Sequence, residues 1–157
     1  MKRKIYFSVL CVAVLGLAAL SPLAAQSNDI LDSVVLDPEM LYKDGAYLVL
    51  TAAGVVPDTA SPEDAVQALR EKSGEWKIKD FSPGEPITLG EYSYLIMRAF
   101  SVKGGFLYAL FPGGRYAARE LVFKEWIIGP TSPYRTVSGE EALDILGRAM
   151  EAVEVQS

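Results

Sequence analysis

The chain has 157 residues, of which 20 are acidic and 15 basic, so its formal net charge is −5. It has no histidine and one cysteine, which leaves no imidazole for a catalytic triad or a metal site and no pair of thiols for a disulfide. The acidic balance, with no block of basic residues beyond the first four positions, argues against nucleic acid or anionic lipid as a main partner.

The first 25 residues have the three parts of a secretory signal peptide. Residues 2–4 are basic, residues 5–20 are apolar and uncharged, and small residues lead up to Ala25. We predict cleavage after Ala25 and export to the periplasm or the cell envelope or surface. The alternative is an uncleaved anchor, because residues 5–25 are just long enough to span a bilayer.

The single cysteine lies inside this apolar segment, where Leu10 precedes Cys11. A lipoprotein cysteine ends such a segment after a small residue, so we expect no lipid anchor. Cleavage after residue 25 would remove three of the fifteen basic residues and no acidic one, which leaves 132 residues with a net charge of −8. A chain of that length can bury a core without disulfides, and we expect one domain.

An internal repeat organises the rest of the chain. Residues 75–100 align with residues 125–150 without a gap, and eight of the 26 positions are identical. A repeat of this period is typical of architectures built from similar units. We expect an earlier, more degenerate copy, because residues 48–57 are similar to residues 121–130.

Each unit is predicted to form helix, loop, helix, with a capped second helix. A hydroxyl residue followed three positions later by an acid starts each second helix: Ser61 with Asp64, Thr88 with Glu91, and Ser138 with Glu141. The two glutamate pairs match the reciprocal capping box, of which Asp64 gives a weaker version. Apolar residues then recur at helical spacing. The expected second helices are 62–72, 89–99 and 139–153, and the expected first helices include 38–53 and 115–126.

The segment between the two clear repeats is rich in glycine and aromatic residues. Glycine pairs at 104–105 and 113–114 bracket the apolar run 106–111. We predict a short helix or turn whose apolar side chains are covered by the neighbouring units; the alternative is an exposed apolar patch. Residues 26–37 are expected to be a polar lead-in, and residues 154–157 a frayed tail.

The loops before the two clear capped helices resemble the second half of an S-layer homology (SLH) unit. In that family an apolar-Gly stretch leads through a proline-bearing loop to Ile-Thr-Arg-Ala-Glu at the start of a helix. The matching segments are 81–92 and 126–142. Residues 115–121 are also similar to a segment of exported envelope proteins of spirochaetes. We therefore predict an all-α fold, in which two to three SLH-like helix-loop-helix repeats pack as one small domain. The domain would span 38–153, with units at about 38–73, 75–100 and 115–150.

The resemblance implies a role in attachment, through noncovalent contact with cell-wall glycan or peptidoglycan. The threonine, arginine and glutamate of the family motif lie at or near its ligand groove. Leu89 and Gly139 stand where the family has arginine. The positions that match, and that we take as possible contacts with a ligand or partner, are Thr88, Glu91, Ser138 and Glu141. The alternative is that these four residues only cap their helices.

Two tryptophans and two arginines recur at equivalent repeat positions. We interpret Trp76 and Trp126 as core residues between units, with a sugar-stacking platform as the alternative. Arg98 and Arg148 fall in the last turn of their helices, where the helix dipole favours cations. A ligand role is the alternative for these arginines.

The residues for most enzyme chemistry are missing. The chain has no histidine, no cysteine after residue 25, no phosphate-binding loop and no calcium loop. Glu91 and Glu141 could form the carboxylate pair of a glycan hydrolase, which is a remote alternative. We predict a non-enzymatic envelope protein without catalytic residues, cofactor or metal, whose partner is cell-wall glycan or another envelope protein. A periplasmic protein–protein adaptor that has lost glycan binding is the alternative.

Overall fold

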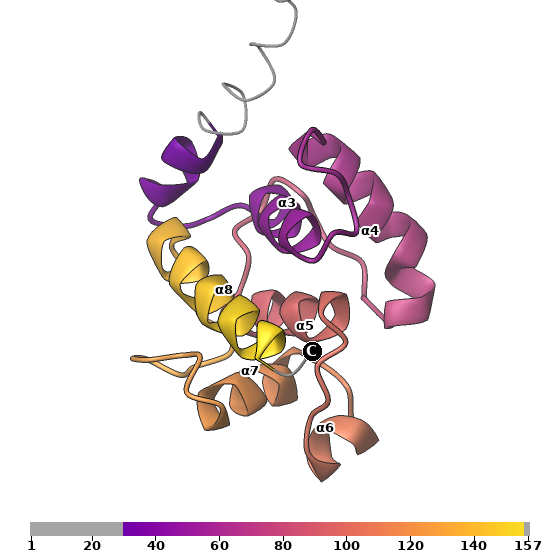
Figure 1. Cartoon of the computed structure of the whole chain (residues 1–157), viewed down its shortest axis with the longest axis vertical. Helices are drawn as coiled ribbons and strands as arrows, with labels where there is room; N and C mark the ends of the chain where they lie inside the picture. Colours follow the sequence, from indigo (N-terminus) through magenta and orange to yellow (C-terminus); the bar gives the residue numbers. More distant parts are fainter. Residues whose placement is uncertain (1–29, 156–157) are drawn as a thin grey trace, which may run out of the picture. The chain divides into compact units, whose positions relative to one another are not determined.

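The computed structural model describes residues 30–155 (Figure 1). The predicted signal peptide, its cleavage site and the last two residues lie outside the described residues. The chain divides into two compact units, 1–32 and 33–157, and the architecture below is that of the second. Among the described residues the fold is all-α, as predicted, with two isolated β-bridges and no strand. No helix in this range is long and apolar enough to span a membrane.

The predicted helices are confirmed, with shifts at some ends. Capped starts occur at Ser61, Thr88 and Ser138. The helix predicted from residue 38 begins four residues later, and the one predicted to end at residue 126 ends at 123, because Glu125 takes a left-handed conformation with φ 61°. The helices are α3 (Tyr42–Ala52), α4 (Pro62–Trp76), α5 (Leu89–Ala99), α6 (Phe106–Leu110), α7 (Gly114–Phe123) and α8 (Gly139–Glu154).

A closed circuit of three backbone hydrogen bonds joins the loops that precede α3, α5 and α8. The amide of Met40 donates to the carbonyl of Val137 at 2.9 Å, that of Val137 to Ile87 at 3.2 Å, and that of Ile87 to Met40 at 2.9 Å. Each of these residues stands two positions before its helix, and all three side chains are fully buried. Three extended strand-like segments thus meet around one point of the core.

The first amide of each of these helices is bound in the opposite cyclic order. Tyr42 donates to the carbonyl of Glu85 and Leu89 to that of Arg135, while Gly139 donates to Asp37, at 2.8–2.9 Å. These bonds satisfy amides that helix starts leave without an intrahelical partner. The helices that share this arrangement are therefore α3, α5 and α8. The sequence pattern had grouped α4, rather than α3, with the other two.

Residues 30–35 form a short helix, where a polar lead-in was predicted. Val34 is buried, and its carbonyl lies against the start of α8. A Cβ on Gly139 would stand 1.6 Å from that oxygen. Glycine at residue 139 therefore permits residues 34–37 to pack on α8.

The two tryptophans lie in the core, as predicted. Trp76 is 8% exposed and Trp126 is 7% exposed. Trp76 is the last residue of α4, and Trp126 follows the end of α7. Both side chains thus add to the core that surrounds α5 and α8. The largest fully buried side chains include Met40, Leu50, Leu69, Ile87, Leu89, Tyr92, Leu121 and Ile145.

Residues 106–110 of the predicted segment do form a short helix, α6, but the expectation that the apolar side chains of 106–111 are covered was wrong. Phe106 is 78% exposed, and Leu110 and Phe111 are each 56% exposed. Figure 1 shows α6 at the periphery, beyond α5 and α7. Only Tyr108 of this helix turns into the core, because a five-residue helix has one inner position to bury.

Candidate functional site

Thr88 and Glu91 form a complete capping box at the start of α5. The Thr88 hydroxyl accepts the Glu91 amide at 3.3 Å, and the Glu91 carboxylate accepts the Thr88 amide at 2.9 Å. The same carboxylate accepts the Thr88 hydroxyl at 2.6 Å. Both side chains are thus engaged in holding the helix start.

Ser138 and Glu141 differ from this pattern. The Ser138 hydroxyl accepts the Glu141 amide at 3.3 Å, but the Glu141 carboxylate turns to Arg135, which it binds with both oxygens. The reciprocal box predicted here is therefore wrong, whereas the one predicted to be weaker, at Ser61 and Asp64, is complete. The hydrogen bonds from Ser61 also lower the pKa of the Asp64 carboxyl.

Arg135 was missed in the sequence because it belongs to no motif. Its Nε donates to the carbonyl of Pro130 at 2.9 Å, and its Nη1 donates to that of Thr136 at 3.0 Å. The hydrogen bond to Glu141 raises the pKa of this guanidinium. Arg135 thus closes the loop 130–136 onto α8, and most of its donors are occupied.

The positions where the SLH family has arginine are internal in this chain. Leu89 is fully buried, and Gly139 is covered by the carbonyl of Val34. An arginine at either position would place a charge in the core or overlap the backbone. These positions therefore serve packing here.

The tryptophans offer no open face for stacking on a sugar. The Lys72 ammonium lies 5.5 Å from the ring of Trp76, and the Lys124 ammonium lies 5.7 Å from that of Trp126. With both indoles more than nine-tenths buried, the stacking-platform alternative is not supported.

Arg98 lies in the last turn of α5, as predicted, but the prediction for Arg148 was wrong, because α8 continues to Glu154. Both arginines hold the tryptophans by their backbone. Arg148 donates to the carbonyl of Trp126 at 3.3 Å. Arg98 acts through a tyrosine: its guanidinium donates to the Tyr94 hydroxyl at 2.8 Å, and that hydroxyl donates to the carbonyl of Trp76 at 2.7 Å. Arg98 of α5 is thus linked to the end of α4, and Arg148 of α8 is linked to the residue that follows the end of α7 by three positions.

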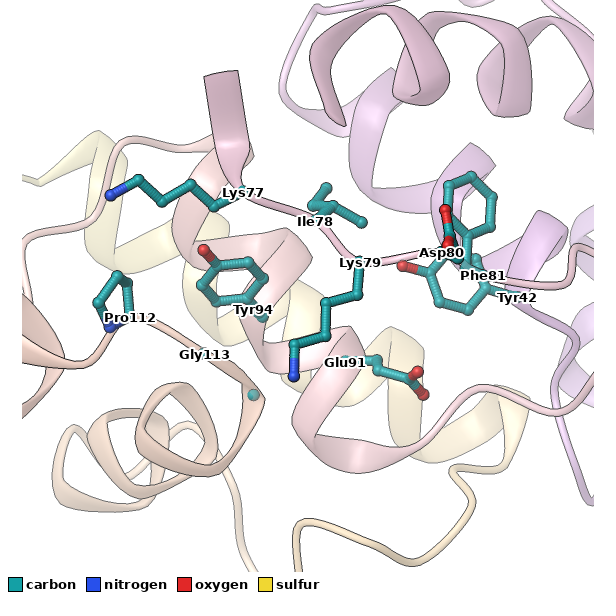
Figure 2. A pocket seen from close by; sticks show the side chains of 11 residues that line it. Tyr42, Lys77, Ile78, Lys79, Asp80, Phe81, Glu91, Tyr94, Pro112 and Gly113 are labelled. Carbon is teal, nitrogen blue, oxygen red and sulfur yellow. The ribbon is translucent and has the colours of Figure 1, made fainter. Parts of the chain in front are cut away.

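One groove brings a predicted site residue together with cations and aromatic rings (Figure 2). We call it the linker groove, because the α4–α5 linker, residues 77–81, forms one wall. Its volume is about 220 Å³. The other walls come from Tyr42 of α3, Glu91 and Tyr94 of α5, and residues 112–114.

The chemistry of the linker groove is mixed. Lys77 and Lys79 are exposed, and neither forms an ion pair with a described carboxylate. In Figure 2 the Lys79 side chain extends over α5, between Tyr94 and Glu91. The groove thus offers ammonium donors and a carboxylate acceptor at one opening.

Aromatic rings form the far side of the groove. Tyr42 and Phe81 stack with centroids 4.5 Å apart, and the Arg70 guanidinium lies 5.1 Å from the Phe81 ring. Burial raises the pKa of the Tyr42 phenol above its ordinary range, and the Glu91 carboxylate adds to the rise. Tyr42 therefore stays protonated and can donate a hydrogen bond.

The sequence held one signal for this groove. Lys77 and Lys79 are the basic residues between two predicted helices, at 62–72 and 89–99, and a loop that joins helices is a common place for binding residues. Nothing in the pattern placed Tyr42 opposite them. Of the predicted site residues, Glu91 lines the groove, while Thr88, Ser138 and Glu141 do not.

Among the described residues, no group of three or more histidine, cysteine or acidic side chains could hold a metal ion. Comparison with family models, curated proteins and solved structures finds no match for this chain.

Replacing Thr88 with alanine should cost more stability than replacing Ser138. Thr88→Ala loses two hydrogen bonds to Glu91, so we expect a loss of ~1–2 kcal/mol in the free energy of unfolding. Ser138→Ala loses one bond at 3.3 Å, and we expect ~0.5–1 kcal/mol. Urea unfolding of both variants measures the difference, and equal losses would contradict the two capping geometries.

Proposed function

We propose that this chain is an exported, non-enzymatic attachment module of the cell envelope that binds cell-wall glycan through the linker groove. The observation that carries the proposal is the meeting of Lys77, Lys79, Glu91 and the stacked Tyr42–Phe81 pair at one opening. Ammonium groups can donate hydrogen bonds to the hydroxyls and carboxylates of a sugar, a carboxylate can accept from its hydroxyls, and the half-buried Phe81 can add apolar contact.

Two further features support a binding role. The cyclic bonding of α3, α5 and α8 places three similar loop–helix units around a shared centre, whereas the predicted repeat had grouped α4 with α5 and α8. The carboxylates at the two clear signature positions are engaged within the chain, Glu91 by Thr88 and Glu141 by Arg135. A carboxylate pair free for hydrolysis is therefore absent at these two positions, which favours binding over glycoside hydrolysis.

Replacing both groove lysines should abolish most of the glycan binding. In Lys77→Gln/Lys79→Gln the ammonium donors are lost from exposed positions, so the fold should keep its stability within ~0.5 kcal/mol. We expect binding to insoluble peptidoglycan sacculi to fall about tenfold or more, since charge-assisted hydrogen bonds carry the contact. Co-sedimentation of the exported protein with sacculi, with and without competing soluble glycan, measures it.

Lys103→Gln is the matched control, because Lys103 is an exposed lysine outside the groove. It should bind sacculi as the unchanged chain does. If the unchanged chain does not sediment with sacculi but captures a specific envelope protein, the groove is not a glycan site. The chain would then be a protein–protein adaptor.

A further inference from the structure

The exposed side chains of α6 form a continuous apolar face. Phe106, Leu107 and Leu110 are spaced so that they share one side of a single helical turn, opposite the inward Tyr108, and the exposed Phe111 follows directly after the helix. The inner side is firmly anchored: the Tyr94 and Tyr108 rings meet edge-on at 6.2 Å. The apolar side chains of α6 thus face solvent as a group, whereas exposed apolar side chains of globular domains are ordinarily scattered singly.

The charge around this face is opposite in sign to that of the whole chain. Residues 92–119 contain four basic residues and no acidic one, in a chain whose net charge is −5. Lys103, Arg115 and Arg119 are exposed, and none of them forms an ion pair with a described carboxylate. One carboxylate, that of Glu120, lies beside Gly105 at the start of α6.

The apolar face continues into a basic hollow on α7. Phe111, which follows α6, stacks on Tyr116 at 6.2 Å, and the Arg115 guanidinium lies 5.9 Å from the Tyr116 ring. Arg115, Tyr116 and Arg119 line a hollow of about 260 Å³ with residues 131 and 133. The two guanidiniums, one helical turn apart, can bind an anion between them.

We propose that α6 and this hollow dock the protein onto the surface of an anionic bilayer. The α6 face would enter the interfacial region, while Arg115 and Arg119 bind lipid phosphate, a combination typical of interfacial helices. A lipid surface accepts a projecting apolar turn without a preformed pocket. A symmetric dimer through the same face would bring Lys103, Arg115 and Arg119 of one copy against those of the other, which like charges disfavour.

The test uses the protein recovered from the exporting cell, with its N-terminus read by mass spectrometry. Vesicles of phosphatidylcholine, with or without phosphatidylglycerol, are sedimented with it, and amide hydrogen exchange of 105–111 gives a local readout. We expect binding to anionic vesicles with slower exchange of these amides, and about tenfold weaker binding in Phe106→Ser/Leu110→Ser and in Arg115→Gln/Arg119→Gln.

Two controls match these variants in number and kind. Leu36→Ser/Val155→Ser removes two apolar side chains that are 83% and 89% exposed elsewhere, and Lys77→Gln/Lys79→Gln removes two cations from the linker groove. Both should bind vesicles as the unchanged chain does. The second control should still lose sacculus binding, so the two proposals can fail separately.

Three results would overturn the docking proposal. One is equal protection of α6 by neutral and anionic vesicles, and another is vesicle binding that the α6 variant leaves unchanged. The third is self-association without lipid that the same variant abolishes, which would make a second copy the occupant.

Discussion

Gly139→Ala should destabilise the protein by ~3 kcal/mol or more, although it adds a single methyl group to a helix. The new Cβ would lie 1.6 Å from the carbonyl oxygen of Val34 and 2.5 Å from its carbon, and neither is a side chain that could rotate away. Overpacking against a fixed backbone is costly. Relief requires the segment at 34–37 to leave α8, which breaks the bond from the amide of residue 139 to Asp37. Urea unfolding measures the loss, and faster hydrogen exchange at the amide of residue 139, which loses its acceptor, shows the undocking.

Gly147→Ala provides a control within the same helix. Gly147 is exposed, and a Cβ there would meet nothing within 4 Å. Alanine has a higher helix propensity than glycine, so this variant should gain about 0.5–1 kcal/mol. The two substitutions are chemically identical and should change stability in opposite directions. If both stabilised α8, the close packing of Val34 on Gly139 would be refuted.

This contact occupies a position that the predicted SLH resemblance assigned to a ligand groove. The sequence shows glycine where the family has arginine, but it does not show that residues 34–37, within the predicted polar lead-in, pack against that position. Val34 and Gly139 are more than 100 positions apart in the chain, and no periodic pattern connects them. Local signals, in contrast, were read correctly: the hydroxyl–acid spacing placed three helix starts at the observed residues.

In the candidate site too, local contacts could be predicted from the sequence, whereas contacts between distant residues could not. Capping depends on residues three apart, so the engagement of Thr88 with Glu91 could be expected. Whether a carboxylate stays with its cap depends on competing partners, and Arg135 draws away that of Glu141. The linker groove joins Tyr42 to residues 77–81, which only the packing of α3 beside α4 and α5 brings together. The exposure of α6 followed from its length, since one turn can bury only one side.

Ile87→Ala should cost ~2–5 kcal/mol, because the side chain is fully buried at the point where the three loops bond to one another. The substitution leaves the backbone circuit of Met40, Ile87 and Val137 chemically intact and removes only packing. The Ile87 Cδ1 would lie 3.2 Å from a Cβ on Gly45, so it fills the space that this glycine of α3 leaves open. With no side chain on Gly45 to move in, the cavity cannot collapse easily, which favours the upper part of the range.

Ile128→Ala is the control: that isoleucine is 70% exposed, and its loss should change stability by no more than ~0.5 kcal/mol. Unfolding in urea at constant m-value measures both variants. A loss below ~1 kcal/mol for Ile87→Ala would mean that the centre of the circuit is not packed as the structure describes it.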